Sequence, residues 1–396
     1  MVQAVLRTSG LAAAGVACAA IPAMALTDET PPESQVNKDR LLAELKSLPT
    51  QRAANGREEH LAGLRQTEDL LIDKLKQMGY TPTIHEFDFL GASRQTDEKG
   101  ERVPNRPWRN IIVDIPGKTR EAEMLVFTAH FDAVPRSPGA DDDGSGTVAI
   151  LEMARLLKDR PMQRTLRLCL FNCEEVGLVG SRAYVQSIME EIKPSRPKVE
   201  GGGPGADGEV TPAPAPKYRI LGMVSLDGIA YFSDAPNSQK SPIPDSDLFK
   251  SPTVGDFIGV ATILKHRRWS RALDKAMRES APNLKTVVVD FLPIAPPDLL
   301  RSDHAPFMAA GVPALILADT ANFRSPHYHQ PTDTFDTIDW VRYTDVVRGV
   351  VGAAYRLCGP VGGELIELET PKKKIAAEAP PEPAKPAEAP VIPAAQ

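Results

Sequence analysis

The chain places a histidine and several aspartates around one short loop, TAHFDAVPRSPGADDDGSG, which runs from residue 128 to 146. Carboxylates this close repel one another unless a positive group lies between them. The loop is therefore a solvated acidic loop, a calcium loop or half of a transition-metal site. Its candidate ligands are His130, Asp132 and Asp142. The rest of the chain has to decide between the three interpretations.

Other polar residues follow apolar runs further along the chain. Glu174 and Glu175 follow TLRLCLFNC, Asp227 ends YRILGMVSLD, and His329 comes shortly after ALILAD. In an open α/β sheet the carboxyl ends of the strands form the edge where ligands bind. We therefore expect these side chains and those of the first loop to meet at one site.

The mixture of imidazole and carboxylate groups indicates which ion this site would bind. It favours zinc, or a neighbour such as cobalt or manganese, over calcium, which prefers oxygen ligands alone. The ligands are too many for one tetrahedral zinc and suit two ions roughly 3.5–4 Å apart that share a carboxylate. We therefore expect two ions with Asp142 as the bridge, an arrangement that also relieves the repulsion within GADDDGSG.

The elements that must position these residues alternate between strands and helices. Apolar runs bounded by turn residues predict buried strands over residues 110–115, 124–130, 165–172, 218–227, 285–292 and 314–319. Apolar residues at helical spacing predict helices over 36–48, 58–80, 145–158, 181–192, 268–280 and 304–311. This alternation predicts an α/β fold with a mostly parallel sheet between layers of helices.

Composition narrows the class of protein and its partners. The chain has 396 residues, 42% hydrophobic and 25% charged, which is typical of a folded protein with a sizeable core. Its net charge is -6 and it has no basic block of the kind that neutralises phosphates, so we expect no nucleic-acid partner.

Two segments are low in complexity, a flexible insertion over 194–217 and a disordered tail over 371–396, and neither is expected to carry chemistry.

Residues 1–25 have the features of an export signal. Arg7 precedes an apolar run that ends in the small-x-small pattern AMA, so the mature protein is expected to begin at Leu26. A single membrane anchor is the alternative, but the run is shorter than the roughly 20 apolar residues that a span needs. We therefore expect a periplasmic or extracellular protein, with cell-envelope association left open and no stable membrane insertion after removal of the signal.

Six stretches occur in order along the chain: HFDAV, PGADDDGSG, NCEEVGLVGS, LDGIAYFSD, SDHAPFMAAGVPA and SPHYHQPTDT. Together they resemble the successive metal-site motifs of the dizinc aminopeptidases, the family of aminopeptidase Y and bacterial leucyl aminopeptidase. The resemblance covers roughly residues 40–358. It implies the phosphorylase/hydrolase-like fold, an α/β three-layer sandwich with a mixed, mainly parallel sheet and helices on both faces. The zinc peptidase domain would then extend over residues 26–370.

The resemblance also implies a set of zinc ligands. One zinc would be bound by His130 and Asp227, the other by Glu175 and His329, and both by Asp142. The chain would thus hold two Zn²⁺ ions. His327 is a competing candidate for His329, but the stretch YHQPTDT matches the family motif at His329.

Two further carboxylates have implied catalytic roles. Glu174 would be the general base that takes a proton from the attacking water. Asp132 would accept the free N–H of His130 and fix its tautomer. The resemblance further implies a cis peptide bond between Asp142 and Asp143. Asp303 and its neighbour in SDHAPF are expected to line the substrate side, with a helix-capping role as the alternative.

The implied activity is that of a secreted zinc exopeptidase acting on peptides, foremost an aminopeptidase that removes apolar N-terminal residues. A carboxypeptidase or another amidohydrolase on the same scaffold stays open as an alternative. A glutaminyl cyclase shares several motifs but uses one zinc, and the intact GADDDGSG argues against it. A catalytically dead binding module would have lost ligands, and this chain has them all. The sequence indicates no oligomeric state.

Overall fold

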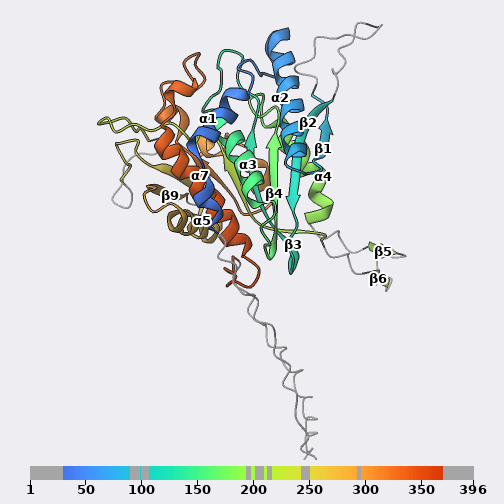
Figure 1. Ribbon diagram of the computed structural model, residues 1–396. Helices are drawn as coiled ribbons and strands as arrows, with labels where there is room; N and C mark the ends of the chain where they lie inside the picture. Colours follow the sequence, from blue (N-terminus) through green and yellow to red (C-terminus); the bar gives the residue numbers. More distant parts are fainter. Residues whose placement is uncertain are drawn as a thin grey trace, which may run out of the picture.

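An eight-stranded mixed sheet forms the centre of the computed structural model (Figure 1). The residues that the structure describes are 30–89, 99, 107–192, 198–200, 209–211, 216–241, 250–291 and 296–368. In chain order, the strands of this sheet are β1 (Thr83–Phe87), β2 (Trp108–Ile115), β3 (Arg120–His130), β4 (Arg164–Phe171), β7 (Arg219–Leu226), β8 (Ile258–Ile263), β9 (Thr286–Phe291) and β10 (Ala314–Ala318).

The strand order is β1-β2-β4-β3-β7-β10-β8-β9. The four central strands β4, β3, β7 and β10 run parallel to one another, so their carboxyl ends share one edge. Antiparallel pairs join β1 to β2, β2 to β4 and β10 to β8, whereas β8 and β9 are parallel. The predicted α/β class and mainly parallel centre are confirmed. The strands β1 and β8 were not predicted. β1 is short and mostly exposed or half-buried, and in β8 half-buried positions alternate with buried ones.

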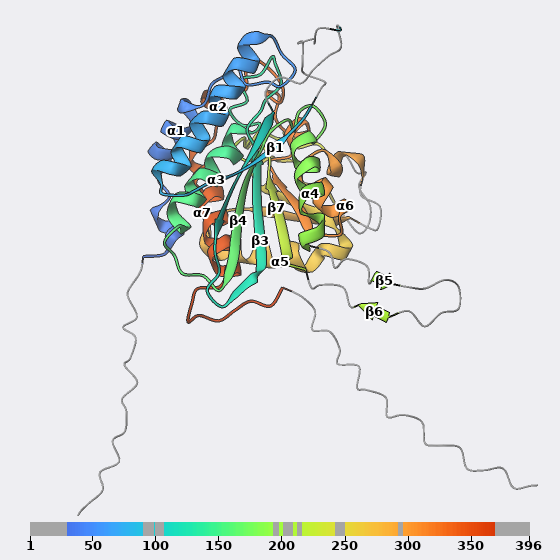
Figure 2. The ribbon, with the colours of Figure 1, turned by 90° about the vertical axis from the view of Figure 1, so that its right-hand side faces the viewer.

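Helices cover both faces of the sheet (Figure 2). They are α1 (Lys38–Ser47), α2 (Glu58–Gln77), α3 (Gly144–Leu157), α4 (Val179–Ile192), α5 (Arg267–Ser280), α6 (His304–Ala309) and α7 (Trp340–Cys358). The larger core lies under α1, α2, α3, α5 and α7, and a smaller one lies under α4 and α6. The sequence did not predict α7, which is rich in valine, a residue with lowered helix propensity. Its buried face, including Val346, Val347 and Val350, stabilises it through packing.

The low-complexity segments fall largely outside the described residues. Within the predicted insertion, β5 (Lys198–Glu200) and β6 (Glu209–Thr211) form a separate antiparallel pair. The predicted export signal and the predicted tail over 371–396 both lie outside the described part of the chain. Among the helices that are described, none combines the length and apolar character needed to cross a bilayer.

Candidate metal centre

The predicted site residues come together at the carboxyl edge of the parallel strands. His130 is the last residue of β3, and Asp227 directly follows β7. The paired glutamates Glu174 and Glu175 come from the turn after β4, and Asp142 lies just before α3. The parallel direction of these strands brings together residues that are far apart in sequence.

The turn after β4 directs the side chains of Glu174 and Glu175 toward the site. Cys173 has a backbone φ of 60°, in the left-handed region, so the strand ends and the chain bends there. The backbone N–H groups of Glu174 and Glu175 donate to the two carboxylate oxygens of Asp132, at 3.0 and 3.2 Å. Asp132 therefore holds this turn against the end of β3.

The contact between Asp132 and His130 differs from the prediction. Nδ1 of His130 lies 3.1 Å from the backbone carbonyl oxygen of Asp132 and 3.6 Å from its nearer carboxylate oxygen. The carbonyl is thus the acceptor that orients the imidazole ring, because the carboxylate is engaged by the glutamate amides. In this orientation Nε2 of His130 faces the other ligands.

Asp142 lies between the two histidines. Its Oδ1 is 3.3 Å from Nε2 of His130, and its Oδ2 is 3.0 Å from Nε2 of His329. The same nitrogen of His329 is 3.1 Å from Oε2 of Glu175. The possible ligand atoms form two groups, each within 4.8 Å: His130, Glu174 and Asp227, and Asp142, Glu175 and His329. One oxygen directed at each histidine is the arrangement that a bridging carboxylate requires.

The donor set fits bound metal ions. Oδ2 of Asp142, Oε1 of Glu175 and Nε2 of His329 are buried and have no hydrogen-bond partner, even though Asp142 and His329 approach closely. Such atoms are unfavourable in a folded protein unless another group satisfies them. Imidazole nitrogens beside carboxylate oxygens are the ligands that zinc prefers. The residues at this edge are therefore suited to hold zinc.

Burial and charge shift the pKa values of these groups. Burial opposes protonation of His329, but Asp142 and Glu175 outweigh it and raise its pKa to about 10. Burial, followed by the charge of Asp142, raises the pKa of Glu175 to about 7. Burial also raises the pKa of Glu174 well above its usual value. In the absence of metal the site therefore binds protons that a metal ion would displace.

Asp143 organises the site without being a predicted ligand. Its Oδ1 accepts hydrogen bonds from the backbone N–H groups of Gly146 and Gly228, at 3.0 and 3.2 Å. Its Oδ2 accepts one from the N–H of His130 at 3.0 Å. The peptide bond between Asp142 and Asp143 is cis, as the resemblance implied. One buried side chain thus joins β3, the start of α3 and the end of β7.

Asp333 connects two motifs that lie far apart in the chain. It is buried, and its two carboxylate oxygens accept the N–H groups of Asp141 and Asp142 at 2.9 and 3.2 Å. It belongs to the same stretch as His329, so the HYHQPTDT segment supplies a candidate ligand and also holds the backbone of Asp142. His327 has a different role, because its Nδ1 pairs with Thr332 at 2.9 Å.

A buried glutamate supports the turn that carries the glutamate pair. Glu68 of α2 accepts a hydrogen bond from the side-chain amide of Asn172 at 2.8 Å and one from Arg109 at 2.8 Å. The side chain of Asn172 in turn accepts the N–H of Cys173 at 2.8 Å. Sequence reasoning missed Glu68, because nothing local relates α2 to a turn about a hundred residues later.

Asp303 and His304 were expected to line the substrate side, with helix capping by Ser302 or Asp303 as the alternative. Both residues are 0% exposed, so neither lines an open substrate surface. Asp303 is at the N-cap position of α6, but its side chain makes no capping bond. Burial raises the pKa of Asp303 to about 7. Ser302 instead borders the cavity described next, and its Oγ pairs with that of Ser225 at 3.0 Å.

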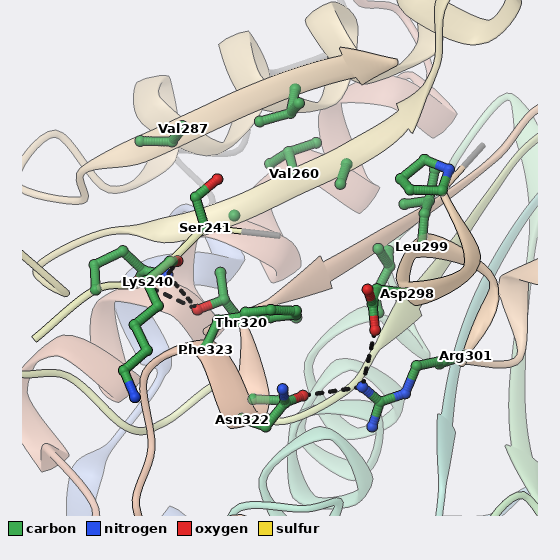
Figure 3. Close-up of a pocket in the computed structure, with 18 of the residues that line it drawn as sticks. Lys240, Ser241, Val260, Val287, Asp298, Leu299, Arg301, Thr320, Asn322 and Phe323 are labelled. Carbon is green, nitrogen blue, oxygen red and sulfur yellow. Dashed lines mark hydrogen bonds and ion pairs between the residues drawn. The ribbon is translucent and has the colours of Figure 1, made fainter. Parts of the chain in front are cut away.

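An apolar cavity of about 180 Å³ opens beside Asp227 and Tyr328. Figure 3 shows Val260 of β8 and Val287 of β9 on two adjacent strands of its wall. Across the opening, Arg301 donates hydrogen bonds to Asp298 and Asn322, at 3.4 and 2.9 Å, and to Tyr328 at 2.8 Å. The cavity therefore offers space for an apolar group next to Asp227.

A family model described as peptidase family M28 matches residues 110–354. The protein YfbL of Escherichia coli (strain K12) is 25% identical over 280 residues, which are 67% of this chain and 76% of that protein. Aminopeptidase YwaD of Bacillus subtilis (strain 168) is 45% identical over 108 residues, which are 27% of this chain and 24% of that protein.

Solved structures share the fold at low sequence identity. BSAP, a zinc aminopeptidase from Bacillus subtilis, superposes with a TM-score of 0.56 at 17% identity, covering 83% of this chain and 95% of that chain. A glutaminyl cyclase from Fimbriiglobus ruber superposes with a TM-score of 0.54 at 16% identity, covering 81% of this chain and 95% of that chain. At these identities the similarity establishes the α/β fold alone.

Proposed function

The chain belongs to peptidase family M28, and from this premise we propose that it is a dizinc aminopeptidase. The observation that carries the proposal is the position of Asp142, whose two oxygens lie 3.3 and 3.0 Å from the nitrogens of His130 and His329. A carboxylate placed in this way can bind two ions at once. The zinc in BSAP and the aminopeptidase activity named for YwaD are consistent with it.

Five residues would hold the two ions: His130 and Asp227 one, Glu175 and His329 the other, with Asp142 shared. Bound zinc supplies the Lewis acid that activates water and polarises the scissile carbonyl. The protein contributes fixed ligand positions, through the bonds of Asp132, Asp143 and Asp333 described above.

Glu174 is the proposed general base. Its Oε2 lies 4.0 Å from Nε2 of His130, so it borders the ligands from the turn after β4. Burial raises its pKa well above the usual value, which favours a carboxyl group that takes and holds a proton. Glu174 would accept the proton of the attacking water and deliver it to the leaving amine.

The cavity beside Asp227 would hold the side chain of the N-terminal residue. Its wall is built mainly from apolar residues such as Val260, Val287 and Phe323. Burial of an apolar group there gains about 25 cal/mol for each Å² removed from water. The enzyme would therefore prefer peptides that begin with apolar residues.

Glutaminyl cyclase is the second candidate, because a protein of that name shares the fold. Metal content and substrate use separate the candidates. We expect two zinc ions per chain and hydrolysis of leucyl and phenylalanyl reporter amides whose amino group is free. Equal hydrolysis of the acetylated amides would indicate a carboxypeptidase or another amidohydrolase. One zinc per chain together with cyclisation of N-terminal glutamine would indicate the cyclase.

We further propose that residues 1–25 direct export and are removed, so that the enzyme acts outside the cytoplasm. Arg7 and the apolar run before Leu26 support this proposal. N-terminal sequencing of the protein from its native host is expected to begin at Leu26. A sequence that begins at Met1 would contradict export by cleavage.

A further inference from the structure

A buried arginine from outside the matched family region contacts the loop that carries two metal ligands. Arg52 lies between α1 and α2, whereas the family match begins at residue 110. Only 2% of its surface is exposed. Its backbone oxygen also accepts the N–H of Ala133, at 2.9 Å. Arg52 is therefore packed against the β3–α3 loop through both its main chain and its side chain.

The guanidinium group joins the two ends of this loop. Its Nε donates to the carbonyl of Phe131 at 2.8 Å, one residue after His130. Its Nη1 and Nη2 donate to the carbonyls of Pro138 and Gly139, both at 2.5 Å. Hydrogen bonds from a charged donor are stronger than neutral ones. One side chain thereby fixes the separation between the start of the loop and the segment that leads to Asp142.

The loop has little freedom to move where Arg52 contacts it. Gly139 has a φ of +64°, and a Cβ atom added there would lie 2.9 Å from Nη2 of Arg52 and 2.6 Å from the carbonyl oxygen of Asp142. The backbone around Gly139 is therefore packed closely between the arginine and the bridging residue. A shift of the guanidinium would be transmitted to Asp142.

The charge of Arg52 also opposes that of the nearby acids. Burial lowers its pKa, while the charges of Asp333, Asp132, Asp143 and Asp142 raise it. A guanidinium group stays protonated under such conditions. The hydrogen bonds of Arg52 go to backbone carbonyls and not to one of these carboxylates. Its positive charge therefore reduces the repulsion among all four carboxylates, which favours their close approach at one edge of the sheet.

We propose that Arg52 is a positioning residue for the metal centre, which holds His130 and Asp142 in their ligating arrangement before metal binds. The proposal rests on the proposed metallopeptidase function of this site. A lysine at position 52 would keep the charge but lose the planar fork of nitrogens that donates to the carbonyls of Phe131, Pro138 and Gly139 in a fixed geometry. The Arg52→Lys variant should therefore bind zinc less tightly.

Zinc release from the purified holoenzyme to an excess of chelator tests the proposal. Arg164 is a matched control, because it is fully buried and donates to the carbonyls of Leu357 and Ile366, both at 2.8 Å, from the start of β4. Loss of a group that supports a metal ligand lowers metal affinity by about 10–100-fold, so we expect Arg52→Lys to release zinc ~10–100-fold faster than wild type. Arg164→Lys should lower the unfolding temperature and leave zinc release unchanged. Equal release rates for wild type and Arg52→Lys, or the same acceleration in both variants, would overturn the role of Arg52.

Hydrogen exchange of the wild-type enzyme provides a second test that needs no variant. After removal of zinc, the N–H of Ala133 and those of the loop up to Asp142 should stay protected, because Arg52 holds the loop without metal. Protection that appears only when zinc is returned would overturn the proposal. Wild-type protein that takes up no zinc would refute the proposed function and, with it, the role of Arg52. Zinc binding by wild type with unchanged release from Arg52→Lys would refute the role of Arg52 alone.

Discussion

The two regions that meet at Asp227 differ in their chemistry. On one side are buried carboxylates and histidines with shifted pKa values, several of whose atoms have no hydrogen-bond partner. On the other side is a cavity whose wall is formed largely by valines and other apolar residues. Under the proposed function, the first region would bind metal and transfer protons, whereas the second would select groups by size and polarity. The proposed function thus assigns reactivity and selectivity to separate parts of the fold.

The two regions should also respond differently to substitution. Loss of a general base removes about 10²–10⁴ in rate, which corresponds to about 3–5 kcal/mol in the activation free energy. A change of one methylene in an apolar pocket alters discrimination by about 1–3 kcal/mol. Substitutions at the charged edge should therefore abolish turnover, and substitutions in the cavity wall should redistribute it among substrates.

The largest effect is expected for Glu174→Gln. The amide cannot accept the proton of the attacking water, so kcat should fall by ~10²–10⁴ while KM changes little. The zinc content should equal that of the wild type, because Glu174 is not a proposed ligand. Steady-state kinetics and metal analysis on the same preparation check this. Loss of zinc from Glu174→Gln would indicate instead that Glu174 is a ligand and that the roles proposed for Glu174 and Glu175 are reversed.

Glu175→Gln should weaken the binding of one zinc ion. A neutral amide oxygen is a poorer ligand than a carboxylate, and the loss should be at least the ~10–100-fold found for partners behind the ligands. In contrast to Glu174→Gln, its activity should be restored in part by added zinc. Full zinc occupancy at wild-type affinity would show that Glu175 is not a ligand.

Zinc affinity should rise with pH. In the metal-free protein the pKa of Glu175 is about 7 and that of His329 about 10. Both must release a proton to bind metal: His329 throughout the range from pH 6 to 9, and Glu175 mainly below pH 7. The apparent Kd should fall by about tenfold per pH unit for each proton displaced. Calorimetric titrations in buffers of different ionisation enthalpy count the protons released, and a pH-independent Kd would contradict these shifts.

The smallest effect is expected in the cavity. Val287→Phe would narrow the cavity that Val287 lines, so the preference for phenylalanyl over alanyl amides, measured as the ratio of kcat/KM values, should fall by about tenfold. Turnover of the alanyl amide should be nearly unchanged. Val341→Phe is the matched control, since Val341 is 71% exposed on α7 and does not border the cavity. An unchanged preference in Val287→Phe would mean that the cavity does not bind the substrate side chain.

The sequence alone predicted the class of the fold and which residues gather in the candidate metal site. His130 and Asp227 each stand at the end of an apolar run. A short apolar run of this kind predicts a buried strand from its local pattern alone. Parallel strands place their carboxyl ends at one edge, so the convergence of these residues follows from topology. The ordered motifs favoured His329 over His327 as a candidate ligand. Of these two histidines, the structure places His329 beside Asp142, whereas His327 pairs with Thr332.

Tertiary structure decided what supports this site. Arg52 contacts the loop through the backbone carbonyls of Phe131, Pro138 and Gly139. Every residue carries such a carbonyl, so no residue pattern in the loop indicates that an arginine about eighty positions away will bond to it. Local sequence does not predict the cavity beside Asp227 either, because β8, β9 and the segments that face them become neighbours only when the sheet is assembled. Strand and helix patterns reflect the local repeat of the backbone, whereas these contacts depend on which surfaces the folded chain brings together.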